Sequence, residues 1–288
     1  MNLLKAVSIS ILFGISAVSA AEWQTDIKSN NPIVGKIWDN ANQRFITQQQ
    51  LLDQMSEIDW ILLGENHETD IHHELQTEIL ELLSQKKILG NVAFEMANTD
   101  QQSELDSALG EPSNPEQLNW QKGWPWEWYE SPVNLALTKA NRVLSTDLTR
   151  QQQMQAYMDE SIDHPNEHYK NFMLDILYES HCGKLPKSQL GNMLRVQIAR
   201  DRQMGRVLKE NSTDKVDLYI AGNMHVRKDA GVPFHNELNS LSIMMLSVGD
   251  SRDPFEIIPD SYQDEAIADY VIFTPEVEQR DHCSQIEG

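Results

Sequence analysis

The sequence has few basic residues for its length. Its 288 residues include 23 Lys and Arg against 44 Asp and Glu, a formal net charge of −21, and no segment is rich in Lys or Arg. Nucleic acids bind to positively charged surfaces, and an anionic membrane surface repels a chain of this charge. We therefore expect neither nucleic acid nor lipid headgroups as partners.

Several short motifs that signal a specific chemistry are also missing. The chain has no Cys-x-x-Cys pair, no Cys-x-x-Cys-His segment, no Gly-x-Ser-x-Gly segment and no His-Glu-x-x-His segment. These absences exclude a dithiol redox motif, covalent haem attachment, the serine nucleophile of the esterase elbow and the zinc-peptidase helix.

Long hydrophobic runs are scarce, and the one at the N-terminus is short. Lys5 is the only charged residue among residues 1–20, an apolar run covers residues 6–18, and the small residues Val18-Ser19-Ala20 follow. A membrane-spanning helix needs about 20 apolar residues, so this pattern predicts a cleaved signal peptide over residues 1–20. The alternative is an anchor that stays uncleaved. No cysteine follows the run, so we expect a periplasmic protein that is not a lipoprotein and does not insert stably into the membrane.

Only two cysteines are present, Cys182 and Cys283. An even count in an exported protein favours one disulfide between them, and the alternative is two free thiols. The 40% hydrophobic and 23% charged residues are typical of a globular protein, and residues 21–288 are enough for one domain with a large core.

The order of apolar segments predicts an α/β fold, with a mainly parallel sheet flanked by helices. Residues 58–63 and 92–94 have the pattern of buried strands, and residues 71–87 between them have helical spacing, which together predict a βαβ unit. Further strands are predicted at residues 142–145, 216–221 and 241–248. Residues 151–212 have helical periodicity, strongest at 171–180 and 189–209, and we expect them to form an α-helical subdomain or cap.

Acidic and imidazole side chains follow three of these predicted strands. Gly64-Glu65-Asn66-His67 and Gly222-Asn223-Met224-His225 share the spacing Gly-x-x-His, and Glu95 follows the strand at 92–94. Parallel strands end at one edge of a sheet, so Glu65, His67, Glu95 and His225 are expected to meet there, with Asp147 at the same edge. We interpret the four as candidate catalytic residues. Each alone is also consistent with an interior histidine or a helix cap.

Other residues near these motifs would line a ligand site. Arg227 is suited to binding a carboxylate, although it would also form a surface ion pair with Asp229. Of His72 and His73 on the following helix, we expect one to face solvent. A tryptophan cluster would either pack in the core or form a wall for a planar ligand. Its members are Trp120, Trp124, Trp126 and Trp128.

At these motifs the sequence resembles the ChaN-like haem-binding family, part of a superfamily with the Tiki, TraB and erythromycin-esterase-like proteins. The resemblance implies a parallel-sheet domain with a helical subdomain, haem binding in iron uptake, and possible homodimerisation around the ligand. It rests on residues 62–67 with His72-His73, residues 93–96, residues 181–186, residues 197–204, residues 221–229 and Gly231-Val232-Pro233.

The sequence departs from the family pattern at a few positions. Some members are lipoproteins, whereas this chain lacks the lipidation cysteine, and Met224 stands where a glycine is expected. The family implies a tyrosine haem ligand, which no motif places in this chain; histidines would also ligate iron or hold propionates. The candidate ligand-binding residues are Arg227, Tyr129, Tyr157, Tyr169, Tyr178, His164, His168 and His181.

Two functions of different classes remain open. The first is periplasmic haem binding for haem and iron uptake, with haem between the sheet edge and the helical cap. The second is a hydrolase of the peptidase or esterase kind at the strand ends. In that case His67, Glu95 and His225 would hold a divalent metal such as zinc while Glu65 activates water, or Glu65 and His67 would act without metal.

Overall fold

The computed structural model describes residues 23–27, 29–263 and 266–276. The predicted signal peptide at residues 1–20 lies outside these residues, as does Cys283, so the signal and the Cys182–Cys283 disulfide stay predictions. Within the described ranges, no helix combines the length and the apolar character needed to cross a membrane.

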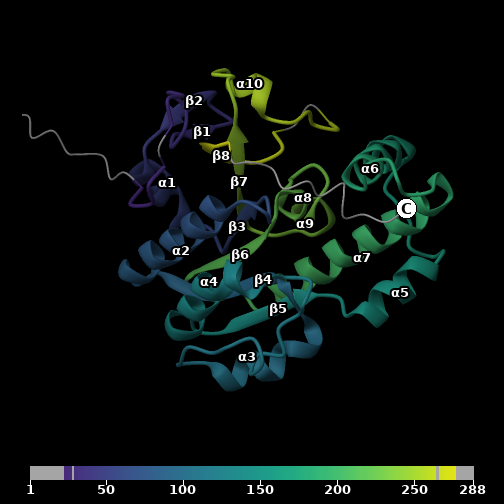
Figure 1. The fold of residues 1–288 in the computed structure, drawn as a ribbon, viewed down its shortest axis with the longest axis horizontal. Helices are drawn as coiled ribbons and strands as arrows, with labels where there is room; N and C mark the ends of the chain where they lie inside the picture. Colours follow the sequence, from purple (N-terminus) through teal and green to yellow (C-terminus); the bar gives the residue numbers. More distant parts are fainter. Residues whose placement is uncertain (1–22, 28, 264–265, 277–288) are drawn as a thin grey trace, which may run out of the picture.

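A mixed sheet of eight strands forms the centre of the protein (Figure 1). The strand order is β2-β1-β8-β7-β3-β6-β4-β5, and the six strands from β8 to β5 run parallel, whereas β1 and β2 pair antiparallel at one edge. The predicted α/β fold with a mainly parallel sheet is confirmed. The strands are β1 (Ile37–Asp39), β2 (Arg44–Ile46), β3 (Trp60–Glu65), β4 (Leu89–Asn98), β5 (Val143–Asp147), β6 (Val216–Gly222), β7 (Ser240–Val248) and β8 (Tyr270–Pro275).

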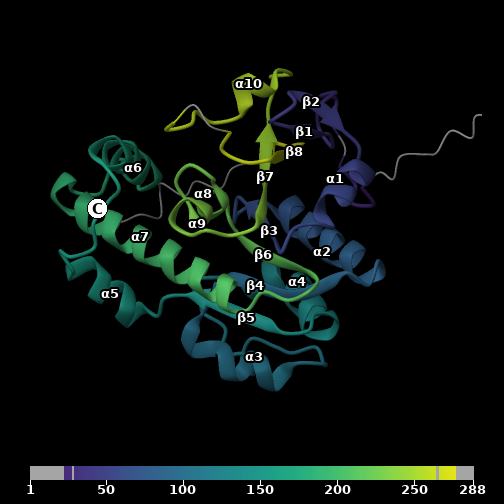
Figure 2. The same ribbon diagram turned by 180° about the vertical axis from the view of Figure 1, so that it is seen from behind.

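Helices cover both faces of this sheet (Figures 1 and 2). Along β3, Ile61 and Leu63 pack with α1, α2 and α4 on one face, while Trp60 and Leu62 pack with α7, α8 and α9 on the other. Burial on both faces explains why β3 is apolar almost throughout rather than alternating. The helices are α1 (Gln48–Met55), α2 (Asp70–Gln85), α3 (Gln102–Ala108), α4 (Trp126–Lys139), α5 (Arg150–Met158), α6 (Glu167–Ser180), α7 (Lys187–Glu210), α8 (Asn223–Val226), α9 (Val232–His235) and α10 (Pro254–Ile257), with a 3-10 turn at Thr99–Gln101.

Residues 150–210, where the sequence predicts helices, form α5, α6 and α7. These helices lie at one side of the molecule, and α6 packs on α7 through a separate apolar cluster that includes Tyr169, Met173 and Leu194 (Figure 2). The 24-residue α7 continues from this cluster to the sheet, where Met204 and Leu208 join the core. α7 therefore connects the helical region to the strand ends.

The predicted strand boundaries differ from the structure in a way that matters for the site. The strand predicted at residues 92–94 is the middle of β4, so Glu95 lies within a strand rather than after it. Glu65 and Gly222 are the last residues of β3 and β6. The edge strands β1 and β2 and the strand β8 were not predicted, because they are short or lie next to polar segments without a clear period.

Candidate functional site

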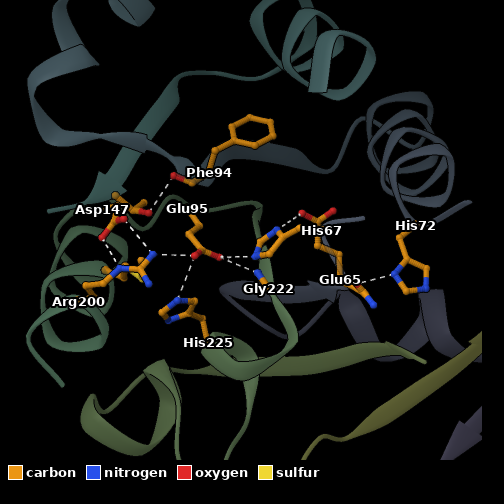
Figure 3. Close-up of polar contacts among 12 residues, drawn as sticks. Glu65, His67, His72, Phe94, Glu95, Asp147, Arg200, Gly222 and His225 are labelled. Atoms are coloured by element: carbon orange, nitrogen blue, oxygen red, sulfur yellow. Dashed lines mark hydrogen bonds and ion pairs between the residues drawn. The ribbon is translucent and has the colours of Figure 1, made fainter. Parts of the chain in front are cut away.

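The four predicted side chains come together at the carboxyl ends of neighbouring strands (Figure 3). β6 lies between β3 and β4 in the sheet, and Glu65 is in register with Gly222. Because these strands are parallel, their ends share one edge, and Glu65, His67, Glu95 and His225 form a continuous chain of contacts there.

Glu65 is fully buried and accepts hydrogen bonds through both carboxylate oxygens. Oε1 accepts from the Tyr129 hydroxyl at 2.7 Å and lies 2.7 Å from Nδ1 of His67. Oε2 accepts from the side-chain amide of Gln76 and lies 3.2 Å from Nε2 of His73. Burial opposes the charged carboxylate, but the hydrogen bonds and positive charge of the two histidines outweigh it and hold the Glu65 pKa well below its usual value. Glu65 is therefore ionised.

Glu95 joins the two Gly-x-x-His motifs. Its Oε1 accepts a hydrogen bond from Arg200 at 2.7 Å and lies 3.1 Å from Nε2 of His225. Its Oε2 accepts from the backbone N–H of Gly222 at 2.7 Å and lies 3.7 Å from Nε2 of His67. Burial disfavours ionisation here as well, yet the charges of His225, His67 and Arg200 keep the Glu95 pKa well below its ordinary value.

Arg200 and Asp147 extend this network to β5. Nε of Arg200 donates to Oδ1 of Asp147 at 2.9 Å, and Nη2 donates to Oδ2 at 2.9 Å, in addition to its bond to Glu95 (Figure 3). Asp147 therefore lies at this edge of the sheet, as predicted. Arg200 supplies a permanent positive charge that a buried pair of carboxylates requires.

His225 is a buried cation. Nδ1 lies 2.6 Å from Oδ1 of Asp201 on α7, and Nε2 faces Glu95. Burial opposes the charge, but these two carboxylates raise the His225 pKa to about 10. Both ring nitrogens therefore carry protons and donate them. Among the residues that the structure describes, no group of three or more His, Cys, Asp or Glu side chains has metal-site geometry.

His67 is the accessible member of the network. Its side chain is 29% exposed, whereas those of Glu65, Glu95 and His225 are at most 5% exposed. Glu65 fixes the ring through Nδ1, so Nε2 points toward Glu95. A Cβ at Gly222 would lie 2.6 Å from this Nε2, so the second motif requires glycine for the ring to approach. The carboxylates raise the pKa of His67 despite its burial. The result is a partly exposed histidine held by Glu65 through Nδ1, with Nε2 directed at the Glu95 carboxylate.

The tryptophan cluster packs onto the histidines of this site. The ring of Trp124 lies 4.6 Å from that of His67, and the ring of Trp128 stacks on His73 at 5.9 Å. His72 and His73 are both buried, so the expectation that one faces solvent is wrong. His73 reaches Glu65, and His72 instead contacts β8.

Several candidate ligand residues are buried and already engaged. Arg227 is 3% exposed and makes two hydrogen bonds to Asp229, at 2.8 and 2.6 Å, so this pair is internal rather than on the surface. Tyr129 donates to Glu65, and Tyr169 lies 2.9 Å from Nε2 of His235, with both tyrosines fully buried. In this conformation none of the three reaches a ligand at the surface.

The exposed candidates lie on the helical side of the molecule. His168, in the first turn of α6, is exposed and packs edge-on against Tyr262. His181, which follows the last residue of α6, is half-buried. Neither belongs to the strand-end network.

The residues that sequence reasoning missed are Arg200, Asp201 and Gln76. Arg200 and Asp201 lie inside residues 197–204, a segment that carries the family resemblance, and that was the available signal. Their pairing with Glu95 and His225 spans more than twenty positions of sequence, so no local pattern reveals it.

Comparison with protein families matches residues 51–235 to the family described as haem-binding uptake, Tiki superfamily, ChaN. The match covers more than half of the chain and includes both Gly-x-x-His motifs. The protein belongs to the ChaN family. No curated protein matches the sequence.

A solved ChaN structure agrees with the family assignment. A ChaN structure from Campylobacter jejuni, described as showing cofacial heme binding, is 26% identical with a TM-score of 0.67, and the match covers 82% of this chain and 95% of that one. An erythromycin esterase mutant, EreC H289N in its open conformation, is 13% identical with a TM-score of 0.46, covering 70% and 73%. The match to the Campylobacter jejuni ChaN thus includes nearly the whole length of that protein.

Proposed function

We propose that this protein binds haem and serves haem and iron uptake in the periplasm. The observation that carries the proposal is membership of the ChaN family, whose model spans the strand-end network and α5 to α7. The likeness to a haem-bound ChaN over most of both chains supports it further.

Accessibility selects among the candidate iron ligands. Tyrosine ligates ferric iron as the phenolate, but burial and the neighbouring Glu65 raise the Tyr129 pKa far above its usual value. Burial likewise raises the pKa of Tyr169. Both phenols are fully buried and have internal partners, so neither reaches a ligand at the surface in this conformation.

His168 and His181 are more accessible, and Tyr157 and Tyr178, both half-buried, stay candidates beside them. Nδ1 of His181 lies 2.8 Å from the carbonyl oxygen of Leu177, which can only accept, so Nδ1 holds the proton and Nε2 keeps its lone pair. Ligating histidines commonly have this arrangement. The exposed ring of His168 reaches the surface without movement of the backbone. Haem would supply the iron, and these residues would supply an axial nitrogen.

A haem titration tests this proposal. Addition of haem to the protein without residues 1–20 should give a shifted Soret band that saturates at a fixed stoichiometry. The band should change on His168→Ala or His181→Ala and not on Gln189→Ala, an exposed neighbour on α7 that cannot ligate iron. Absorbance that rises linearly with haem, without saturation, would reject haem binding.

Localisation and assembly need their own measurements. We propose export through the predicted signal, without lipid anchoring or stable membrane insertion, and a homodimer around the ligand. Cell fractionation should recover the processed chain in the periplasmic fraction. Light scattering with and without haem should show a doubling of mass; a monomer in both conditions would reject the dimer.

The geometry of His67 favours a second candidate, a metal-free hydrolase. Glu65 orients the ring through Nδ1, and the absence of a side chain at Gly222 lets Nε2 lie at the strand end, 3.7 Å from Oε2 of Glu95. In its neutral form, His67 would take a proton from water as the water attacks an ester or amide carbon, and Glu65 would stabilise the imidazolium. The imidazolium would then give this proton to the leaving alcohol or amine as the C–O or C–N bond breaks. Arg200 and His225 would keep Glu95 ionised beside it.

Because the pKa of His67 is raised, this activity should increase with pH across the neutral range. A panel of esters and peptides should be hydrolysed by the wild type and not by Glu65→Gln or His67→Ala. The matched variant His164→Ala, in an exposed loop, should retain the activity. Equal turnover by the wild type and His67→Ala would remove this candidate.

A further inference from the structure

A cavity of about 720 Å³ lies between the start of β1, the N-terminus of α1 and residues 23–27. β1 and α1 are on the opposite side of the molecule from α5, α6 and α7 (Figure 1). Among the described residues that line the cavity, none belongs to the strand-end network. Cavities of this size commonly hold small-molecule ligands. The cavity is therefore a second place, apart from the network, where such a ligand fits.

Residues 23–27 form a fixed wall of this cavity. Nε1 of Trp23 donates a hydrogen bond to the carbonyl oxygen of Gly35 at 3.0 Å. The backbone N–H groups of Gln24 and Thr25 donate to the two carboxylate oxygens of Glu78 on α2, at 2.8 and 2.9 Å. Three hydrogen bonds to distant parts of the chain thus hold this segment against β1 and α2.

Gln48, the first residue of α1, is the buried polar side chain of the cavity. It lines the cavity and is 5% exposed, and its Nε2 is enclosed without a hydrogen-bond partner among the described residues. The next glutamine is bonded, since Nε2 of Gln49 donates to Asp53 at 2.6 Å. A buried amide N–H without an acceptor destabilises a fold. Gln48 therefore offers a donor that the fold leaves unused and that an acceptor atom of a ligand would complete.

The N-terminus of α1 supplies further donors at the same place. The Gln50 N–H is capped by Oγ1 of Thr47 at 3.2 Å, and the Leu51 N–H donates to the Thr47 carbonyl oxygen at 3.1 Å. The N–H groups of Gln48 and Gln49 precede these and have no acceptor inside the helix. The first turn of α1 also has no acidic residue to offset the partial positive charge of the helix end. Together these donors favour a ligand atom with negative charge.

Two charged side chains of opposite sign stand at the exposed part of the wall. Nζ of Lys36 lies over the Phe45 ring, 5.2 Å from its centre, and Asp26 is on the facing segment. Both are exposed, so water and salt screen them. The enclosed amide and the helix end therefore decide which polar group binds.

The rest of the wall is largely apolar. Trp23, Ile27, Val34, Ile37 and Ile46 line the cavity, and Ile37 belongs to the core on which the first two and Ile46 pack. A small anion such as acetate leaves this surface uncovered, and a purely apolar molecule leaves the amide unpaired. A carboxylate with a hydrocarbon chain satisfies both parts of the wall.

We propose that this cavity binds a monocarboxylate with an apolar chain. The carboxylate accepts hydrogen bonds from Nε2 of Gln48 and from the N-terminus of α1, and the chain lies against the apolar wall. This site goes beyond the proposed haem binding and does not depend on it.

Calorimetric titration of residues 21–288 with three probes tests the proposal. Octanoate should bind with saturation at one site per chain. Acetate, which lacks the chain, and octanol, which lacks the charge, should each bind at least about tenfold more weakly. The net charge of −21 repels anions from the molecule as a whole, so a preference for octanoate over octanol reports local donors. Equal affinities for octanoate and octanol, or no saturable binding of octanoate, would overturn the proposal.

Two variants of Gln48 separate ligand binding from a structural role. Gln48→Leu removes the donor at similar size, so octanoate affinity should fall by about 10- to 100-fold while octanol affinity is unchanged. Its melting temperature without ligand should stay the same or rise, because an unpaired buried amide is replaced by hydrocarbon. Gln48→Glu, which suits a helix N-terminus, should abolish octanoate binding by charge repulsion.

The matched control is Gln54→Leu, at an exposed glutamine of the same helix outside the cavity wall, which should bind octanoate like the wild type. A lower melting temperature of Gln48→Leu with unchanged octanoate affinity would show that Gln48 has only a structural role, and the proposal would fall.

Trp23 reports where octanoate binds, because its ring lines the cavity. Octanoate should shift the tryptophan fluorescence of the wild type and leave that of Trp23→Phe unshifted, with similar affinity in calorimetry. A shift of the same size in Trp23→Phe would place octanoate elsewhere on the protein and reject this cavity.

Discussion

Mild acid should destabilise the protein through His72, a buried histidine that connects the start of α2 to β8. Its Nδ1 accepts a hydrogen bond from the backbone N–H of Asn66 at 2.9 Å, and its Nε2 lies 2.9 Å from Oγ1 of Thr274. A backbone N–H can only donate, so Nδ1 must be unprotonated and the ring neutral. Burial lowers the His72 pKa from 6.5 to about 4, although the charge of Glu65 opposes the shift.

The direction of this shift determines the pH window. The unfolded chain binds the His72 proton at higher pH than the folded chain does. The stability that the neutral ring contributes is therefore fully present above pH 6.5 and is lost as the pH falls toward about 4. One pKa unit corresponds to about 1.4 kcal/mol, so the loss over the window is about 3 kcal/mol.

Urea unfolding of the wild type and His72→Gln at a series of pH values measures this loss. Glutamine does not titrate, and the other ionisable groups are common to both proteins, so their contributions cancel in the difference. The free energy of unfolding of the wild type should approach that of His72→Gln as the pH falls from about 7 to about 4, by about 3 kcal/mol. A difference that stays constant over this range would refute the buried, neutral state of His72.

Two further predictions concern packing and the disulfide. Gly222→Ala should lower the free energy of unfolding by about 1–3 kcal/mol, because the new Cβ would lie 2.6 Å from Nε2 of His67. The control is Gly191→Ala, whose new Cβ meets no atom within 4 Å and which should be neutral or stabilising in the same denaturation assay. Equal stability of the two variants would contradict the close approach of His67 to Gly222. Cys182 and Cys283 should give no reaction with a thiol reagent in the unfolded, unreduced protein purified from the periplasm, and two reactive thiols per chain would exclude the bond.

The strand-end network illustrates what a linear pattern can predict. Short apolar runs that end at Gly64 and Gly222 indicate buried parallel strands, and parallel strands must end at one edge. Glu65, His67, Glu95 and His225, which end or follow the predicted strands, were therefore expected to meet. They do meet, although Glu95 lies within β4 rather than after it. The argument needs only local periodicity and the topology of an α/β sheet.

The partners of these residues could not be predicted in the same way. Arg200 and Asp201 are on α7, far along the chain from the strands they contact, and the turn of α7 that faces the sheet edge depends on how the helix packs. Arg227 and Tyr129 had the right chemistry for a ligand, but burial and internal partners engage both of them. The packed structure, and not the sequence pattern, determines that Arg227 pairs with Asp229 and that Tyr129 donates to Glu65.

By itself, the sequence determined the α/β class, the helical segment beside the sheet and the meeting of two Gly-x-x-His motifs, because these follow from hydrophobic period and chain order. Only the tertiary structure decided which side chains remain available to a ligand. Burial and charge pairing act between residues brought together from distant positions. They left His67 partly exposed at the strand ends and His168 exposed on α6, and they enclosed Glu65, Glu95, His225 and Arg227.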